Sequence, residues 1–162
     1  MLGGLVSVTR HDCCSQGDEV KFYVAAFIGE KERVRRIHHR LRELGHEITV
    51  DWTAHPGVFG KDREKYPERV REIAIRDMNG VRDCDVFVLL SEPADGRAKY
   101  VELGAAIMSY LEKGKPRVYV LGQETHQSVF FYHPAVKRVR TLDEVLADIK
   151  EGSDVDKSAE RM

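Results

Sequence analysis

Glu102 is the residue of this sequence best placed to do chemistry. It stands in an otherwise apolar run that extends from Val101 to Met108, so the helix around it must be covered on most sides. Burying an ionised carboxylate there is costly unless the group has a partner or a function. Near the start of a helix, the dipole and the free backbone N–H groups would hold Glu102 ionised, which favours a nucleophile over a general acid. The alternative is a Glu that only stabilises the first turn or lies on the polar edge of the helix.

Asp77 is a second carboxylate in an unexpected place. The stretch from Pro67 to Arg82 has apolar residues at helical spacing, and the same spacing puts position 77 on the inward stripe. A lone carboxylate on the buried face of a helix needs a hydrogen-bond partner or a ligand. Asp77 is therefore a second candidate for a functional residue. The alternative is a structural pair with Arg76, Arg82 or a loop amide.

The segment before Glu102 predicts how that residue is positioned. Val86 to Leu90 is unbroken apolar sequence, which is typical of a parallel strand buried on both faces. Ligands in open α/β sheets bind outside the carboxyl ends of the strands, and this end leads through a loop at 91–99 to Glu102. A long loop at 53–65 is expected at the same end of the sheet. We interpret its His55 as a surface residue rather than a substrate contact.

Strands and helices alternate along the chain. We expect strands at 22–28, 46–52, 86–90, 117–121 and 137–139. We expect helices at 30–44, at 67–82, around Glu102, and at 141–150. This alternation predicts the α/β class, as a single flavodoxin-like (Rossmann-like) domain with an about five-stranded parallel sheet between helices and right-handed crossovers.

The ends of the chain differ in composition from its middle. Residues 1–19 show no clean periodicity, and we interpret them as an N-terminal extension that is partly disordered. Residues 20–150 would form the domain. Residues 151–162 are polar, and we expect a frayed C-terminal tail.

The composition excludes several classes of function. Lys and Arg number 26 against 27 Asp and Glu, and the net charge of -1 removes the electrostatic argument for a nucleic-acid binder. No run approaches the ~20 apolar residues that span a bilayer, and the first residues lack the pattern of a signal peptide. We therefore expect a cytoplasmic protein with no membrane partner. The three cysteines fit neither a disulfide framework nor a zinc-ligand pattern, so no metal is expected.

A resemblance to a known family rests on residues 76–107, which read RDMNGVRDCDVFVLLSEPADGRAKYVELGAAI. This block resembles the core motif of the nucleoside 2-deoxyribosyltransferase superfamily, including the nucleotide N-glycoside hydrolases that act on CMP or deoxynucleoside monophosphates. The resemblance implies that Glu102 is the nucleophile or oxocarbenium stabiliser at the sugar anomeric carbon. It implies that Asp77 contacts the ribosyl moiety or the base and assists proton transfer, and two carboxylates in distinct settings suit this chemistry. It also implies a homo-oligomer.

The resemblance further implies that two loops at the strand ends contact the substrate. The predicted substrate-binding residues are Ala25, Phe27, Ser91, Asp95, Gly96, Arg97 and Lys99. The first loop departs from the Gly-rich phosphate-binding turn of the nucleotide hydrolases, because Gly29 is followed by Glu30. Arg97 and Lys99 at a helix start could supply an alternative anion site. The other interpretation of these two cations is that they are solvated loop charges.

Together these features predict an enzyme that cleaves or transfers the N-glycosidic bond of a nucleoside or nucleoside 5′-monophosphate, with no cofactor. Its partner would be a small-molecule nucleoside or nucleotide, with the 5′-monophosphate slightly preferred. A hydrolase and a transferase would use the same nucleophile and differ in whether water or a second base accepts the sugar. The alternative function is a catalytically weak nucleotide-binding or TIR-like signalling module of the same fold.

Overall fold

The computed structural model describes residues 19–159. The strands are β1 (Lys21–Ala25), β2 (Glu47–Ile48), β3 (Val86–Leu90), β4 (Arg117–Leu121) and β5 (Val136–Val139). The helices are α1 (Lys31–Glu43), α2 (Asp62–Lys65), α3 (Pro67–Asp83), α4 (Arg97–Lys113) and α5 (Leu142–Ala159). Short 3-10 helices are η1 (Ile28–Glu30), η2 (Trp52–Ala54) and η3 (Val129–Tyr132). The predicted extension at 1–19 lies outside the described residues, apart from Glu19.

The strands form one parallel sheet in the order β2-β1-β3-β4-β5. This confirms the predicted α/β fold with a parallel sheet of five strands. The central strand β3 has the predicted bounds, and all of its residues are buried. A parallel strand inside such a sheet is covered on both faces, which is why its sequence is a continuous apolar run.

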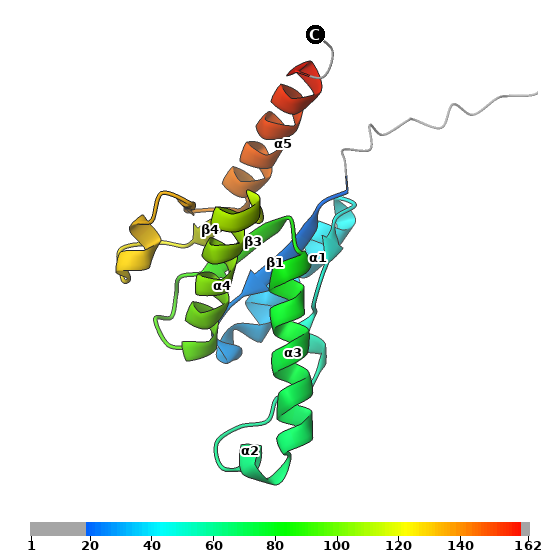
Figure 1. Cartoon of the computed structure of the whole chain (residues 1–162), viewed down its shortest axis with the longest axis vertical. Coiled ribbons are helices and arrows are strands. Elements are labelled where there is room, and N and C mark those ends of the chain that lie inside the picture. The colour runs from blue at the N-terminus through cyan, green and yellow to red at the C-terminus, as the bar shows by residue number, and fades with distance from the viewer. Residues whose placement is uncertain (1–18, 160–162) are drawn as a thin grey trace, which may run out of the picture.

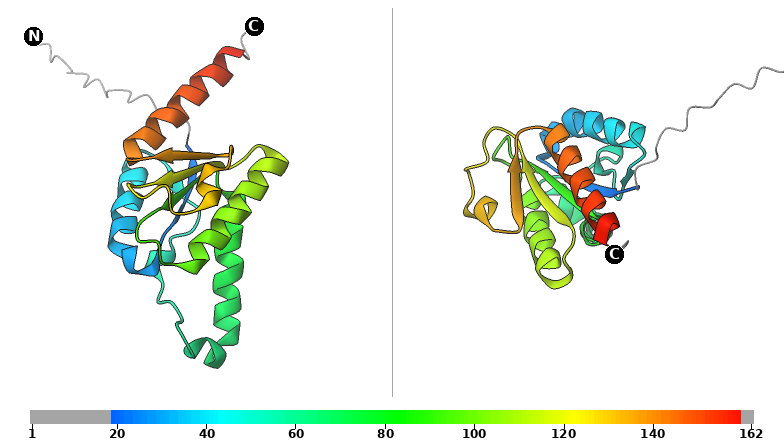
Figure 2. Two further views of the ribbon diagram at one scale, coloured as in Figure 1. Left: turned by 90° about the vertical axis from the view of Figure 1, so that its left-hand side faces the viewer. Right: turned by 90° about the horizontal axis from the view of Figure 1, so that it is seen from above.

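Helices cover both faces of the sheet (Figures 1 and 2). Successive residues of β1 point to opposite faces, so Phe22 and Val24 join one core cluster, while Tyr23 and Ala25 join the other. The first cluster also holds buried residues of α1 and α5, and the second holds buried residues of α3 and α4. The side of the sheet that carries Tyr23 is therefore the side that carries α3 and α4.

The second predicted strand is much shorter than expected. The prediction covered 46–52, but only Glu47–Ile48 pairs with β1, and η2 begins at Trp52. Asp51 accounts for the difference, because its carboxylate accepts hydrogen bonds from the backbone N–H and the hydroxyl of Thr53. Such local bonds compete with a strand ladder. The chain therefore turns at Asp51 and places Trp52 beside the end of β1.

Two other predicted ends also differ from the structure. The first strand ends at Ala25 rather than at residue 28, because the chain enters η1 there. The last helix, expected at 141–150, continues to Ala159, so part of the predicted tail is helical. In Figure 1 the end of α5 and the lower half of α3 project from opposite ends of the sheet.

Helix α4 begins earlier than expected, and this changes the setting of Glu102. Its first residue is Arg97, so Glu102 lies in the second turn rather than the first. The chain enters the helix through Gly96, which has a φ of 102°, and a side chain at this position would meet the backbone of Phe27. Glycine is suited to both conditions. The contact brings the loop before α4 against the end of β1.

Cys84 links α3 to the sheet. Its side chain is fully buried, and the thiol donates a hydrogen bond to the carbonyl oxygen of Val81. Burial raises the pKa of this thiol to about 12.

None of the helices at 19–159 is both long and apolar enough to span a bilayer.

Candidate active site

A cavity of about 840 Å³ opens on the side of the sheet that carries α3 and α4. Its walls are the segment after β1, the loop that follows η2, one face of α3, and the first turns of α4. Asp77 and Glu102 both line it, so the fold brings the two predicted catalytic carboxylates into one cavity. A depression of about 530 Å³ on the other side of α3 is lined by neither carboxylate.

Glu102 is held by a buried tyrosine. The hydroxyl of Tyr23 donates a hydrogen bond of 2.8 Å to Oε1 of Glu102. Tyr23 lies on β1 with no exposed surface, and its ring stacks on Phe87 of β3. Burial and the neighbouring carboxylates raise the pKa of Tyr23 far above its usual range, so the phenol stays protonated and acts only as a donor. This bond fixes one oxygen of Glu102 and leaves the other for a ligand.

The expectation that Glu102 is held ionised by a helix start is wrong. Burial, the largest effect, and the charge of Asp77 together raise the pKa of Glu102 to about 7, although the Tyr23 hydrogen bond opposes both effects. Because Glu102 lies in the second turn of α4, it is also removed from the free N–H groups at the helix start. Near neutral pH, both the protonated and the ionised forms of Glu102 are populated.

Asp77 has a partner and also faces the cavity. Its Oδ1 accepts hydrogen bonds from Nε and Nη2 of Arg76, at 3.1 and 2.9 Å. Its side chain is 20% exposed, so the inward position predicted from the spacing is half-buried at the cavity wall. Arg76 is one of the three partners that the structural alternative named, and the pair leaves Asp77 as part of the cavity lining.

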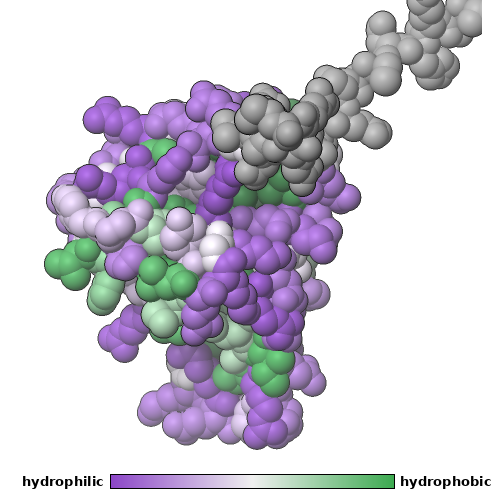
Figure 3. Space-filling view, turned by 45° about the horizontal axis from the view of Figure 1, so that its top comes forward, coloured by the Kyte–Doolittle hydropathy of each residue, from purple (hydrophilic) through white to green (hydrophobic). Residues whose placement is uncertain are grey.

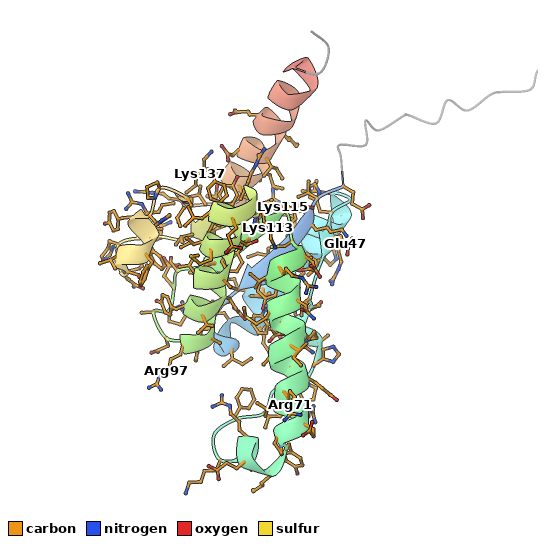
Figure 4. The ribbon with its side chains drawn as sticks, in the orientation of Figure 1. Glu47, Arg71, Arg97, Lys113, Lys115 and Lys137 are labelled. Atoms are coloured by element: carbon orange, nitrogen blue, oxygen red, sulfur yellow. The ribbon has the colours of Figure 1, made fainter. Side chains whose placement is uncertain are left out.

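Some of the binding residues predicted around the start of α4 line the cavity, and others do not. Asp95, Gly96 and Arg97 line the cavity. Ser91 is fully buried at the end of β3 and does not line it. Figure 4 shows the side chain of Arg97 pointing outward from the start of α4, and Arg97 has no ion pair among the described residues.

Lys99 does not lie where the predicted anion site requires it. Its side chain is fully buried, and Nζ donates hydrogen bonds to the carbonyl oxygens of Leu90, Ser91 and Pro93, at 3.1, 3.1 and 2.5 Å. Three acceptors leave the ammonium no donor for a ligand. Burial also lowers its pKa. Lys99 therefore organises the loop from within, and the interpretation of Arg97 and Lys99 as a paired anion site is corrected.

The first predicted loop contributes through its last residues. Ala25 is fully buried in the core cluster below the cavity, so it supports the site without lining it. Phe27, with Ala26 and Ile28, lines the cavity wall. Of the two residues predicted here, only Phe27 is in a position to touch a ligand.

A partly exposed ion pair connects the loops at the strand ends. The carboxylate of Glu92 accepts hydrogen bonds from the backbone N–H groups of Gln123 and Glu124, which follow β4. Nη1 of Arg33 on α1 lies 3.5 Å from the same carboxylate. Glu92 thus joins the loop after β3 to the loop after β4 and to α1, and this restrains the segment that leads to Glu102.

Tyr23 and Trp52 belong to the site and were not predicted. Tyr23 was interpreted only as part of a buried apolar strand. A buried tyrosine hydroxyl generally has a hydrogen-bond partner, and this rule could have indicated a polar contact for Tyr23. Trp52 lines the cavity, and its Nε1 donates to the carbonyl of Val24 at 2.8 Å. His55 is exposed, as predicted, and it also lines the cavity. The loop contacts could not be predicted because they depend on how residues 53–66 fold back onto α3.

Comparisons with known proteins support the fold. Searches found no matching family model and no matching curated protein. Among solved structures, the chain is similar to the CMP N-glycosidase BcmB of Clostridium botulinum, with a TM-score of 0.50 and 16% sequence identity. The match covers 80% of this chain and 98% of that chain. At this identity the similarity shows a common α/β fold.

Proposed function

We propose that this protein is an N-glycosidase that acts on a nucleoside or a nucleoside 5′-monophosphate. The observation that carries the proposal is the shared cavity of Glu102 and Asp77, in which Glu102 is oriented by Tyr23. Glycosidic chemistry uses two carboxylates in different settings, one at the developing cation and one at the proton. Glu102 is desolvated and Asp77 is paired with a guanidinium, so their settings differ in this way.

In the proposed reaction, ionised Glu102 is the nucleophile or electrostatic stabiliser at the anomeric carbon of the sugar. The bond between this carbon and the base nitrogen breaks, and its electron pair leaves with the base, which takes up a proton. Asp77 contacts the sugar or the base and assists that proton transfer. Water then attacks the anomeric carbon and releases Glu102; if a second base attacks instead, the enzyme is a transferase.

A 5′-phosphate would bind at the start of α4. Gly96 has no side chain to cap the helix, and no other side chain caps it, so backbone N–H groups of the first turn are open to an anion. Asp95, Gly96 and Arg97 line the cavity there, and Arg97 supplies a cation. The charge of Asp95 opposes phosphate binding. Since Lys99 is bonded within the loop, Arg97 is the only one of the two predicted cations that can contribute to phosphate binding.

The proposed homo-oligomer is supported by exposed apolar residues on α3 and α4. The exposed fractions are 55% for Ile75, 40% for Met78, 64% for Val101, 54% for Met108 and 57% for Leu111. Figure 3 shows hydrophobic groups between the hydrophilic residues of the molecule's surface. Met78 and Val101 also line the cavity, so a second copy on this face would cover the open side of the site.

The proposal is tested by incubating the protein with nucleosides, their 5′-monophosphates in ribo and deoxy forms, and NAD. Free base is measured by chromatography, alone and with a second base as acceptor. We expect base release from at least one compound. Glu102→Gln keeps the shape of the side chain and removes its charge, so turnover should fall by about a thousandfold or more.

The fold of Glu102→Gln is checked by thermal melting. The variant should melt at or above the wild-type temperature at pH 8, because wild type must then bury an ionised carboxylate whose pKa is raised to about 7. Turnover within about tenfold of wild type would remove Glu102 from the chemistry. Binding of nucleotides without base release across the panel would favour the alternative, a nucleotide-binding or signalling module.

A further inference from the structure

Arg76 holds the carboxylate of Asp77 by one oxygen only. Its Nε and Nη2 both donate to Oδ1, and no group within residues 19–159 donates to Oδ2 of Asp77. Arg76 lines both the cavity and the depression on the other side of α3, so it forms part of the wall between them. The contact therefore fixes Asp77 from the wall and leaves its second oxygen for a ligand in the cavity.

A second pair on the same helix shows how this contact differs from an ordinary one. Arg82 and Asp83 are also neighbours in sequence, but Nε and Nη2 of Arg82 bond to both oxygens of Asp83, at 2.7 and 2.9 Å. This pair is largely exposed, whereas the pair of Arg76 is partly buried. Neither Arg82 nor Asp83 lines the active-site cavity. The pair of Arg76 is thus the one of the two that presents a carboxylate oxygen to the site.

The charges of this pair reach the groups around Glu102. Burial is the largest cause of the raised pKa values of Tyr23 and Glu102, and the negative charge of Asp77 adds to the rise in both. The positive charge of Arg76 lowers the pKa of Tyr23 and so acts in the opposite direction. Tyr23 is bonded to Glu102 at 2.8 Å. The cation therefore acts against Asp77 at the hydrogen-bonded pair that contains the proposed nucleophile.

We infer that Arg76 is a positioning residue of the active site, which fixes one oxygen of Asp77 and balances its charge while Glu102 ionises. The inference rests on the proposed function, in which Glu102 reacts as a carboxylate. Two carboxylates that share a cavity repel each other when both are ionised. A guanidinium keeps its charge at any pH at which enzymes work, and its planar fork gives the contact a fixed direction. Arg76 thus reduces the repulsion and leaves Oδ2 of Asp77 unbonded.

Other charged and titratable groups face Glu102 from the elements around it. The loop after η2 contributes His55 and Arg63, and the segment that enters α4 contributes Asp95 and Arg97. None of these four forms an ion pair with either carboxylate within the described part of the chain. The variants compared below leave all four in place. Their charges are therefore common to every protein in the comparison.

The experiment follows the ionisation of Glu102 directly, in protein labelled with ¹³C at the side-chain carboxyl of glutamate. The NMR signal that disappears in Glu102→Gln identifies the residue, and its position is recorded against pH. In Arg76→Gln the unbalanced charge of Asp77 should move the midpoint to higher pH, by about half a pH unit or more. In Asp77→Asn the charge of Arg76 is left alone and should move the midpoint to lower pH. An unmoved midpoint in Arg76→Gln, or shifts of the two variants in the same direction, would overturn the inference.

Two further variants separate charge from shape and from folding. Arg82→Gln breaks the matched pair on α3 and should leave the midpoint of Glu102 at its wild-type value. Arg76→Lys keeps the charge and loses the fork, so the midpoint should stay near wild type while kcat/KM falls about threefold or more. Thermal melting checks that each variant is folded. A shift in Arg82→Gln as large as that in Arg76→Gln, or a shift in Arg76→Lys equal to it, would contradict the inference.

Base release by the same variants separates this inference from the proposed reaction. A midpoint that moves by half a pH unit changes the ionised fraction about threefold on its acid side. Arg76→Gln should therefore lose about threefold more kcat/KM at acid pH than at alkaline pH. If no nucleotide releases base but the midpoints move as expected, the reaction fails and the effect of Arg76 on the site stands. If base is released and the midpoint in Arg76→Gln does not move, the reaction stands and the inference about Arg76 is wrong.

Discussion

Tyr23 and Glu102 form a pair in which one residue sets the charge of the other. Tyr23 lies beneath the cavity and donates to Oε1 of Glu102, which favours the ionised carboxylate. Burial acts in the opposite direction and raises the pKa of Glu102 to about 7. The balance of the two effects decides what fraction of Glu102 is ionised at a given pH.

The pH profile of kcat/KM is expected to show this balance. Because the proposed nucleophile is the ionised form of Glu102, activity should rise as the pH passes through about 7. Tyr23→Phe removes the hydrogen bond, so the pKa of Glu102 rises and the acid limb of the profile moves to higher pH. Tyr119→Phe is a matched control, since Tyr119 is an equally buried tyrosine that bonds to Asp148. If the acid limb of the Tyr23→Phe profile does not move, the hydrogen bond from Tyr23 does not set the pKa of Glu102.

Asp77→Asn separates the two interpretations of Asp77. We expect base release to fall by about tenfold or more, with little change in thermal stability, because partly exposed ion pairs contribute about 0 to 1 kcal/mol. Arg76→Gln is the companion variant, since it breaks the same pair and leaves the carboxylate in place. Strong destabilisation by both variants, with unchanged activity per folded molecule, would make Asp77 a structural residue.

The first turn of α4 contains two cations with different roles. Lys99 is buried against three carbonyl oxygens of the loop, whereas Arg97 lies exposed on the cavity wall. They are two residues apart in sequence, and both lie in the first turn of α4. The loop conformation therefore depends on one of them and the proposed phosphate contact on the other.

Lys99→Met should destabilise the protein by about 2 to 4 kcal/mol, because it leaves buried carbonyl groups without donors. Arg97→Ala should leave the melting temperature unchanged and lower kcat/KM about tenfold for the monophosphate only. Both are measured by thermal melting and with paired nucleoside and monophosphate substrates. Equal effects of Arg97→Ala on the two substrates would mean that Arg97 does not contact phosphate.

At the scale of elements, apolar patterns predicted the sheet well and polar contacts poorly. The run Val86–Leu90 matched β3 at both ends because a strand covered on both faces contains only apolar residues. Asp51 ended the second strand early through bonds to Thr53 that the pattern does not encode. Lys99 is the clearest case, since a lysine next to a helix start is usually solvated. Its burial depends on how the loop at 91–96 folds around it.

At the scale of the whole molecule, the cavity is open where α3 and α4 expose apolar side chains. Met108 is 54% exposed on α4 and lies outside the cavity lining. Isolated exposed apolar residues are common in monomers, but a group of them next to a cavity marks an interaction site. A second copy of the chain is the partner that we propose for this face.

Sedimentation velocity tests this proposal. We expect wild type to associate as the concentration rises, and Met108→Glu to remain a monomer, because a charge would have to be buried in the interface. Leu44→Glu is a control, since Leu44 is 51% exposed at the end of α1, on the other side of the sheet. A wild-type protein that stays monomeric at all concentrations would contradict the proposed homo-oligomer.

The buried thiol of Cys84 provides a way to measure local opening of the protein. A thiol with a pKa near 12 and no exposed surface reacts with an alkylating reagent only after α3 separates from the sheet. In a chain with Cys13→Ser and Cys14→Ser, the labelling rate therefore measures how often the cavity wall detaches. A ligand that bridges α3 and α4 should slow labelling in proportion to its occupancy. Labelling as fast as in denaturant would show that this wall is not closed in solution.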